Sequence, residues 1–410
     1  YTSIDMNIQN QLQQAVDNNL AAYTEKSSEG VYSMQGAATC VDNSTGNVVA
    51  IVGSRSQEDI KGYVLNRAYQ SYRQPGSCIK PLNVYTPYLQ LGNTPDTKVT
   101  DSQIDGGPAN ADASYAGEMT LTDAVKWSKN TVAWNIYQQI TPKTGSSFLI
   151  KMGFHKIWVD KDYNAGALGG FTYGVTTEEM AGGYAALAND GVYRKATCIR
   201  LIVDASNKTV VNETNRDSKV YDKSASRMMT QMLREVILSG TGTSANVENA
   251  VVAGKTGTTN ASKDVWFCGY SKYYTTTVWA GYDYPKEMSG VNSRVNAIFK
   301  DFMTAVHTNL PVTDFSTVTQ QTTQPETTAA VQEETQSLPQ ETTAIVPETT
   351  GIEQVTPQQV PSTTAQVPTT TPYQRWTTAP AQPKTTAPMQ YGDIDATTRT
   401  DPDATARGEW

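Results

Sequence analysis

The stretch Arg73-Gln74-Pro75-Gly76-Ser77-Cys78-Ile79-Lys80-Pro81 predicts a turn followed directly by a helix. The Pro-Gly pair interrupts the preceding structure, and apolar residues then recur at helical spacing, at positions 79, 82, 85 and 89. Ser77 is therefore expected where the helix begins. Lys80 lies three residues later, about 300° around a helix that turns about 100° per residue, so the two side chains share one face.

A serine hydroxyl beside a lysine amine is one way to build a nucleophilic serine. The hydroxyl needs a base, and Lys80 can be that base only when it is neutral, which requires burial or a second cation to lower its pKa. An isolated Ser-x-x-Lys pattern is more often the start of a surface helix with a solvated lysine. The interpretation of Ser77 therefore depends on the other motifs of the chain.

Composition and charge narrow the class of protein. The 410-residue chain carries a net charge of -8 and has a pI near 5.0, which argues against nucleic acid as a partner. Its four cysteines are far apart and neither histidine stands near one, so we expect no metal site and no cofactor. We expect the cysteines, which lie in apolar runs, to be buried thiols: Cys40, Cys78, Cys198 and Cys268.

The chain contains no run of 18 apolar residues and no signal peptide, and it begins with Tyr1. We expect that an N-terminal part has been removed. From residue 312 Thr, Pro, Gln and Glu dominate without periodicity, so residues 312–410 cannot bury enough apolar surface to offset the entropy of ordering. We expect one large domain before this point and a disordered tail after it.

Helical and strand-like patterns alternate within the first 311 residues. Asp5 is expected to cap the first helix, and Pro87 is expected to kink or end the helix that follows Ser77. Residues 94–117 are polar and predict a long surface loop. Helices are predicted at 8–20, 79–87, 120–127, 130–140, 176–189, 227–238 and 295–306, and strands at 35–42, 47–52, 251–259, 265–270 and 275–282.

Two further motifs fall at informative places. Ser128-Lys129-Asn130 stands between two predicted helices, and we expect Lys129 to be solvated. Lys255-Thr256-Gly257-Thr258 lies in a strand, where alternation puts Thr256 and Thr258 on one face and Lys255 and Gly257 on the other. Gly257 would let another element approach closely. A phosphate-binding loop is excluded because position 249 holds Asn where that motif needs Gly.

In this order, Ser77-x-x-Lys80, Ser128-x-Asn130 and Lys255-Thr256-Gly257 resemble the active-site motifs of the serine penicillin-binding proteins and β-lactamases. The flanking sequences are similar to the transpeptidase domain of class A (bifunctional) penicillin-binding proteins, at residues 45–53, 66–68, 73–81, 240–242, 254–259, 264–270 and 278–283. The resemblance covers about residues 1–310. It implies an α+β fold with an antiparallel sheet of five strands and helices on both faces. Residues 1–35 would be a linker after a missing glycosyltransferase part, and residues 36–311 the transpeptidase domain.

The resemblance also implies roles for individual residues. Ser77 would be the nucleophile and Lys80 its base, with Lys255 and burial lowering the pKa of Lys80. Ser128 would relay a proton to the leaving amine. Asn130 would hold the substrate amide and Lys80. Hydroxyls of Thr256 and Thr258 would bind the substrate carboxylate beside Gly257, and the backbone N–H groups of Ser77 and Thr258 would form the oxyanion hole.

Two other side chains have the chemistry of a catalyst. Cys78 lies about 200° around the helix from Lys80, so we expect it to pack in the core instead of serving as the nucleophile. His155 is expected to be a surface or packing residue, because none of the three motifs needs it.

The implied function is a peptidoglycan D,D-transpeptidase that cross-links stem peptides and is blocked by β-lactams. A D,D-carboxypeptidase or β-lactamase of the same fold would instead use water to release the acyl group. A non-catalytic penicillin-binding sensor module is a third alternative. The resemblance implies a location at the extracytoplasmic face of a bacterial membrane, with anchoring only through the missing N-terminal part.

Overall fold

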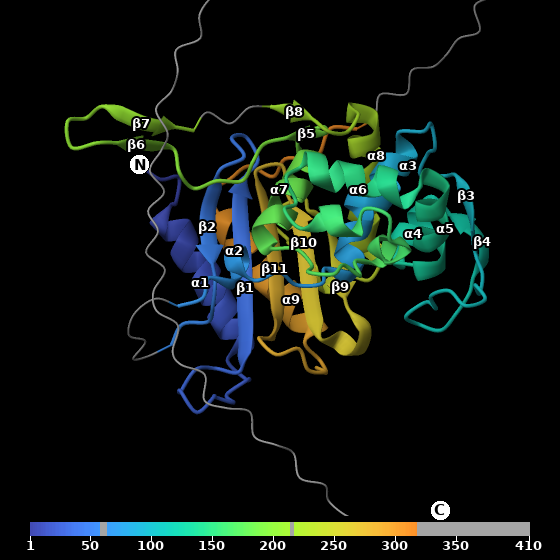
Figure 1. The fold of residues 1–410 in the computed structure, drawn as a ribbon, viewed down its shortest axis with the longest axis horizontal. Helices are drawn as coiled ribbons and strands as arrows, with labels where there is room; N and C mark the ends of the chain where they lie inside the picture. The colour runs from blue at the N-terminus through green and yellow to red at the C-terminus, as the bar shows by residue number, and fades with distance from the viewer. Residues whose placement is uncertain (58–63, 214–216, 318–410) are drawn as a thin grey trace, which may run out of the picture. The chain divides into compact units, whose positions relative to one another are not determined.

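The computed structural model describes residues 1–57, 64–213 and 217–317, and its centre is a five-stranded sheet (Figure 1). All neighbouring strands run antiparallel. Their order is β2-β1-β11-β10-β9, with β1 Met34–Asp42, β2 Val48–Val52, β9 Ala253–Thr258, β10 Asp264–Tyr270 and β11 Tyr274–Tyr282. The predicted α+β fold with five antiparallel strands is confirmed.

Helices cover both faces of this sheet because its strands are apolar on both sides. The neighbours Ala37 and Ala38 of β1 belong to different hydrophobic cores. One core is formed with α1 (Met6–Leu20) and α9 (Asn292–Val306), and the other with α7 (Thr177–Ala188) and α8 (Lys223–Ser239). Figure 1 shows α1 and α9 behind the sheet and α7 in front of it.

The helix ends follow the capping residues that the sequence indicates. Asp5 Oδ1 accepts hydrogen bonds from the backbone N–H groups of Asn7 at 2.8 Å and Ile8 at 3.1 Å, as expected for the start of α1. Thr176 and Glu179 form a reciprocal capping box at α7. These local bonds satisfy N–H groups that a helix leaves unpaired, so they define where each helix begins.

The segment after the Pro-Gly turn is a helix of changing type. It begins as a 3₁₀ turn, η1 (Gly76–Ile79), continues as a turn of π-helix, η2 (Pro81–Tyr85), and ends as α3 (Thr86–Leu89). Of the two outcomes expected at Pro87, an end of the helix is wrong, because the helix continues to Leu89. Both the N–H and the hydroxyl of Thr86 bond to Pro81 O, so the wider π turn lies directly before the proline that lacks an N–H.

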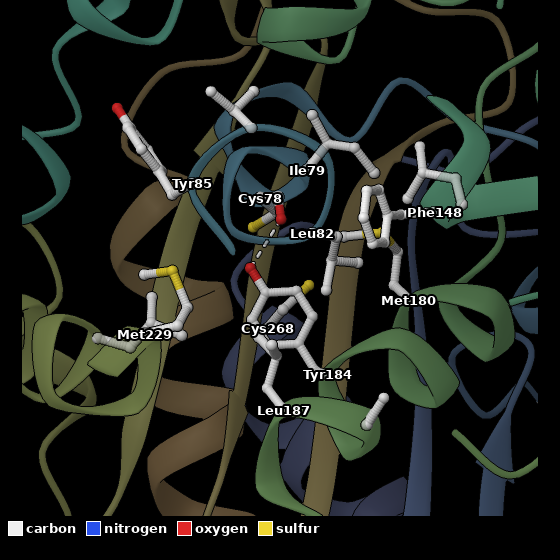
Figure 2. Close-up of a cluster of buried hydrophobic side chains, with 14 of the residues drawn as sticks. Cys78, Ile79, Leu82, Tyr85, Phe148, Met180, Tyr184, Leu187, Met229 and Cys268 are labelled. Carbon is white, nitrogen blue, oxygen red and sulfur yellow. Dashed lines mark hydrogen bonds between the residues drawn. The ribbon is translucent and has the colours of Figure 1, made fainter. Parts of the chain in front are cut away.

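This helical segment is surrounded by the larger of the apolar clusters, shown in Figure 2. Ile79, Leu82 and Tyr85 are fully buried. Tyr184 of α7 donates a hydrogen bond to Cys78 O at 2.7 Å. Packing on several sides therefore holds the turn that carries Ser77.

Short elements build the part of the molecule beside α8. The helices α4 (Leu121–Lys126), α5 (Asn130–Ile140) and α6 (Pro142–Lys151) follow one another. The predicted surface loop 94–117 contains a strand, β3 (Lys98–Asp101), that pairs with β4 (Gly117–Thr120). Remaining short elements are α2 (Arg67–Gln70), β5 (Val192–Tyr193) with β8 (Ser218–Lys219), and β6 (Leu201–Val203) with β7 (Thr209–Asn212).

The predicted domain boundaries stay predictions. Within the described residues, α1 packs against β1, β2 and α9, and the ring of Phe315 packs edge to face against that of Tyr270. Most of the predicted tail, residues 318–410, lies outside the described residues. The helices of the described part are all too short or too polar to cross a membrane.

Candidate active site

Strand β9 lies directly along η1, and two glycines make this contact possible. A Cβ atom on Gly257 would lie 2.5 Å from Pro75 O and 2.7 Å from Cys78 Sγ. A Cβ atom on Gly76, which has φ +53°, would lie 2.6 Å from Thr258 O. The close approach predicted at Gly257 is therefore confirmed, and it brings the third motif against the first.

The ammonium of Lys80 joins the first motif to the second. Lys80 is fully buried. Its Nζ donates hydrogen bonds to Asn130 Oδ1 at 2.7 Å, Ser128 O at 2.9 Å and Lys129 O at 3.4 Å. Ser128 and Lys129 lie between α4 and α5, and Asn130 is the first residue of α5, so the junction of the two helices faces η1.

Lys255 completes the connection from the side of β9. It too is fully buried, and its Nζ donates to Ser128 Oγ at 2.8 Å and to Thr256 O at 3.0 Å. Ser128 therefore contacts both lysines, one through its hydroxyl and one through its carbonyl. The three motifs, far apart in sequence, form one site.

Burial lowers the pKa of both lysines, and the charge of Lys255 lowers that of Lys80 further. Desolvation, together with the positive charge of Lys255, holds the pKa of Lys80 well below that of an ordinary lysine. Desolvation lowers the pKa of Lys255 to about 8. These are the conditions that the sequence interpretation requires if Lys80 is to act as a base at neutral pH.

Ser77 is the second residue of η1 and is half-buried. Its hydroxyl takes part in none of the hydrogen bonds found among the described residues. Cys78 is fully buried, and its Sγ donates to Lys255 O at 3.1 Å. The expectation that Cys78 packs in the core is confirmed, and of the two side chains only that of Ser77 is partly exposed.

The hydroxyls of Thr256 and Thr258 lie on the other face of β9 from the Lys255 side chain. Thr256 Oγ1 is 2.8 Å from Thr241 Oγ1, and Thr258 Oγ1 donates to Asn292 Oδ1 at 3.2 Å. Thr258 is exposed, so its hydroxyl is open to a ligand. Thr241 was not predicted to be part of this site, although it stands in a sequence similar to the family.

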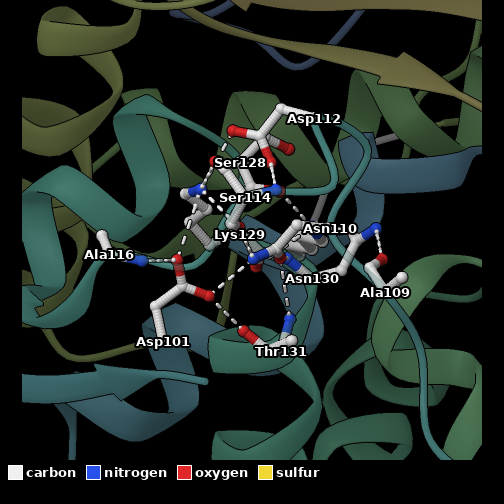
Figure 3. Close-up of polar contacts among 11 residues, drawn as sticks. Asp101, Ala109, Asn110, Asp112, Ser114, Ala116, Ser128, Lys129, Asn130 and Thr131 are labelled. Atoms are coloured by element: carbon white, nitrogen blue, oxygen red, sulfur yellow. Dashed lines mark hydrogen bonds and ion pairs between the residues drawn. The ribbon is translucent and has the colours of Figure 1, made fainter. Parts of the chain in front are cut away.

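Lys129, expected to be solvated, is instead buried, with 5% of its surface exposed. Its Nζ donates to Asp112 Oδ2 at 3.0 Å and Ser114 Oγ at 3.1 Å, and lies 3.3 Å from Asp101 Oδ2. Figure 3 shows these groups around the Ser128-Lys129-Asn130 segment. The expectation is wrong because the loop between β3 and β4 folds over this lysine.

Sequence reasoning also missed Asp101, Asn110 and Gln74. The first two belong to the β3–β4 loop beside the second motif. Gln74 bonds through both amide atoms to the backbone of Phe171, and its Oε1 accepts from Phe171 N at 2.7 Å. Only Gln74 stands in a quoted motif, so the other two had no local signal.

The remaining candidates lie outside the site. Cys198 is half-buried, contrary to expectation, whereas Cys40, Cys78 and Cys268 are buried. His155 is largely exposed and its Nδ1 lies 3.0 Å from Glu179 Oε1. Throughout residues 1–57, 64–213 and 217–317, no three His, Cys, Asp or Glu side chains gather as a metal ion would require.

Solved structures share this fold. The penicillin-binding protein PonA1 from Mycobacterium tuberculosis, in complex with penicillin V, gives a TM-score of 0.65 at 22% identity, covering 77% of this chain and 87% of that one. Penicillin-Binding Protein 1A from Haemophilus influenzae gives 0.64 at 20% identity, covering 77% and 67%. At these identities the similarity establishes the fold alone.

Sequence comparison establishes the family. A family model described as "Penicillin binding protein transpeptidase domain" matches residues 36–304. Penicillin-binding protein 1A of Clostridium perfringens (strain 13 / Type A) is 32% identical over 335 residues, which cover 76% of this chain and 49% of the relative. Penicillin-binding protein 1A of Aquifex aeolicus is 36% identical over 298 residues, which cover 69% and 39%. The chain thus spans less than half the length of these relatives. It belongs to the family of penicillin-binding protein transpeptidase domains.

Proposed function

We propose that this domain is a serine D,D-transpeptidase that cross-links the stem peptides of peptidoglycan and is acylated by β-lactams. The observation that carries the proposal is the pair of buried lysines that meet at Ser128: Lys80 Nζ donates to its carbonyl and Lys255 Nζ to its hydroxyl. A lysine with a lowered pKa next to a serine-bearing turn supplies a base for acyl transfer.

The first half of the reaction forms an acyl-enzyme. Ser77 Oγ attacks the carbonyl carbon of the penultimate D-Ala while its proton passes to neutral Lys80 Nζ. The negative oxygen of the tetrahedral intermediate lies between the backbone N–H groups of Ser77 and Thr258, donors worth about 3 kcal/mol each. The C–N bond to the terminal D-Ala then breaks, and Ser128 relays the proton from Lys80 to the leaving amine, which regenerates neutral Lys80.

The second half returns the enzyme to its free state. An amine of a neighbouring stem peptide attacks the acyl carbon and gives up one proton to neutral Lys80. The bond to Ser77 Oγ then breaks, and this proton passes from Lys80 to Ser77 Oγ. During both steps Asn130 holds the substrate amide, and Thr256 and Thr258 bind its carboxylate beside Gly257. The accessible Thr258 hydroxyl and the Thr256–Thr241 pair support this assignment.

The proposal includes the wider setting of the domain. Residues 1–35 would follow a glycosyltransferase part, residues 36–311 would form the transpeptidase domain and residues 312–410 a disordered tail. The domain would act at the extracytoplasmic face of a bacterial membrane, anchored through the N-terminal part. It would need no metal or cofactor, since Lys80 and the oxyanion donors perform the chemistry.

The decisive measurement is the intact-protein mass after incubation with benzylpenicillin. We expect one stable adduct on the wild type and on Cys78→Ala, and none on Ser77→Ala. The Cys78 variant is the matched control, because it changes the neighbouring nucleophile of the same turn. An adduct on Ser77→Ala would move the nucleophile elsewhere, and unmodified protein in every sample would favour the non-catalytic sensor module.

The fate of the adduct separates the remaining alternatives. Rapid release of penicilloate would identify a β-lactamase. A D-Ala-D-Ala donor peptide should give cross-linked product when an acceptor amine is present, whereas hydrolysed peptide alone would identify a D,D-carboxypeptidase. Mass spectrometry of the peptide products distinguishes the two.

A further inference from the structure

We propose that Asp101, acting through Asn110 and Lys129, is a positioning residue that holds the Ser128-Lys129-Asn130 segment in its active geometry, an inference that rests on the proposed function. Asp101 is the last residue of β3 and has no exposed surface. It touches neither catalytic lysine in the described contacts. Its effect on the reaction would therefore pass entirely through the groups that it binds.

The carboxylate of Asp101 is fully occupied (Figure 3). Oδ1 accepts from Thr131 Oγ1 at 2.5 Å and from Asn110 Nδ2 at 2.6 Å. Oδ2 accepts from Ala116 N at 2.9 Å and lies 3.3 Å from Lys129 Nζ. A carboxylate has about four acceptor positions. Although burial raises its pKa, these donors hold the pKa of Asp101 below its ordinary value, so the group stays ionised.

Asn110 carries the effect of Asp101 to the start of α5. With its Nδ2 bound to Asp101, its Oδ1 accepts from the backbone N–H of Asn130 at 2.7 Å and from that of Thr131 at 3.3 Å. These are the first N–H groups of α5, which a helix leaves without internal partners. Asn110 therefore caps α5 from a different loop and determines where Asn130 lies.

Lys129 links Asp101 to the middle of the Ser128-Lys129-Asn130 segment. Its side chain is clamped between Asp101 and Asp112, so the residue between the two catalytic groups Ser128 and Asn130 cannot turn outward. The backbone carbonyl of Lys129 is one of the three acceptors of the Lys80 ammonium. The ion pairs of Lys129 with the two aspartates thereby orient the backbone carbonyl that accepts from Lys80 Nζ.

The segment needs such restraint because its backbone is strained. Ser128 has φ +58°, a left-handed conformation that non-glycine residues rarely adopt. Such a conformation costs about 1–3 kcal/mol and persists only where the surroundings impose it. Asp101 binds Lys129 and Thr131, which follow this serine closely in the chain, and so restrains the strained backbone from its C-terminal side.

The test is Asp101→Asn, which removes the charge and one acceptor with little change of shape. Acylation by a chromogenic β-lactam is measured at several concentrations, so that non-covalent affinity and the acylation rate constant separate, and mass titration corrects for the competent fraction. We expect the acylation rate constant to fall about 10- to 100-fold, as expected for a small misplacement of catalytic groups. Non-covalent affinity should stay within about twofold, because the Thr256 and Thr258 hydroxyls are untouched.

Asp190→Asn is the matched control. Asp190 forms a two-contact ion pair with Arg227 at 2.8 and 2.9 Å, away from the three motifs. The Asp190→Asn variant should have a lower thermal midpoint than the wild type but the same acylation rate constant. Equal rate constants for the two variants, with lowered midpoints in both, would make Asp101 merely structural and overturn the inference.

Two further measurements keep the test decisive. If Asp101→Asn does not fold, Asn110→Ala removes the α5 cap and should reduce the acylation rate constant in the same way. Amide hydrogen exchange of the peptide spanning residues 126–134 should be faster in Asp101→Asn than in Asp190→Asn. Unchanged exchange would overturn the inference, and this readout does not depend on acylation. Absence of acylation in the wild type would count against the proposed function instead.

Discussion

At the scale of single residues, two buried lysines share one serine and cannot both be charged at low cost. Lys80 has three oxygen acceptors for its ammonium, but burial and the nearby Lys255 oppose its protonation. Lys255 contacts the Ser128 hydroxyl and has a pKa of about 8. The proposed reaction needs neutral Lys80 and charged Lys255 at the same pH, and the strong lowering of the Lys80 pKa favours this pair of states.

We predict a bell-shaped dependence of the acylation rate on pH. The rate should rise with pH well below 10.5, because neutral Lys80 accumulates as pH passes its lowered pKa. It should decline above about pH 8, where Lys255 loses its charge.

Lys255→Met removes the repelling cation, so the pKa of Lys80 rises and the acidic limb of the pH profile moves to higher pH. Lys126→Met, which changes a lysine at the end of α4, is the control. An acidic limb that stays in place in Lys255→Met would contradict the coupling.

At the scale of elements, the site depends on how closely β9 approaches η1. This contact involves the backbone of Gly257 and of Gly76, and the latter adopts a left-handed conformation that glycine tolerates. A side chain at either position would push the strand that carries Lys255 away from the turn that carries Ser77. The two glycines therefore control a distance between elements.

We predict that Gly257→Ala lowers the free energy of unfolding by about 1–3 kcal/mol, as for overpacked cores, and slows acylation. Its Cβ would lie 2.5 Å from Pro75 O. Gly182→Ala on α7 is the matched control, since its Cβ would come only to 3.2 Å from Tyr193 Cε2. Urea denaturation and the acylation assay measure the two effects. If Gly257→Ala keeps the wild-type free energy of unfolding and acylation rate, β9 can move away from η1 without cost, which would contradict the prediction.

At the scale of the whole molecule, the chain continues to pack beyond residue 311. The ring of Phe315 lies 5.4 Å from that of Tyr270, and Arg227 donates to Thr317 O at 2.9 Å. Arg234 and Asp314 form an ion pair at 3.1 Å, which is exposed and adds little stability. Phe315 is therefore the main apolar contact of residues 312–317 with the domain.

We predict that a chain ending at residue 317 keeps the thermal midpoint and acylation rate of the full chain, because the composition of residues 318–410 supports no packed core. A chain ending at residue 311 should lose about 1–2 kcal/mol of unfolding free energy with the Phe315 ring contact. Its acylation rate should not change. Loss of stability on shortening to residue 317 would assign the tail a structural role.

Much of the fold and the catalytic motifs could be predicted from the sequence because both depend on local patterns. Runs of strand-forming residues mark β1, β2, β9, β10 and β11, and capping residues mark the helix starts at Asp5 and Thr176. The sequence did not decide between a kink and an end at Pro87, and the helix continues past it because the π turn before it is packed in the core. Local chemistry thus predicts where an element begins more reliably than how it bends.

By itself the sequence determined the family, the five-stranded antiparallel sheet and the residue types of the three motifs. Only the tertiary structure decided that Lys129 is buried and that Asp101 and Asn110 support the second motif. Thr241 likewise joins the site only in the folded chain. The physical reason is that the polar loop between β3 and β4 has no hydrophobic periodicity, so its sequence does not indicate which surface it covers. Its contacts form only when elements distant in sequence pack together.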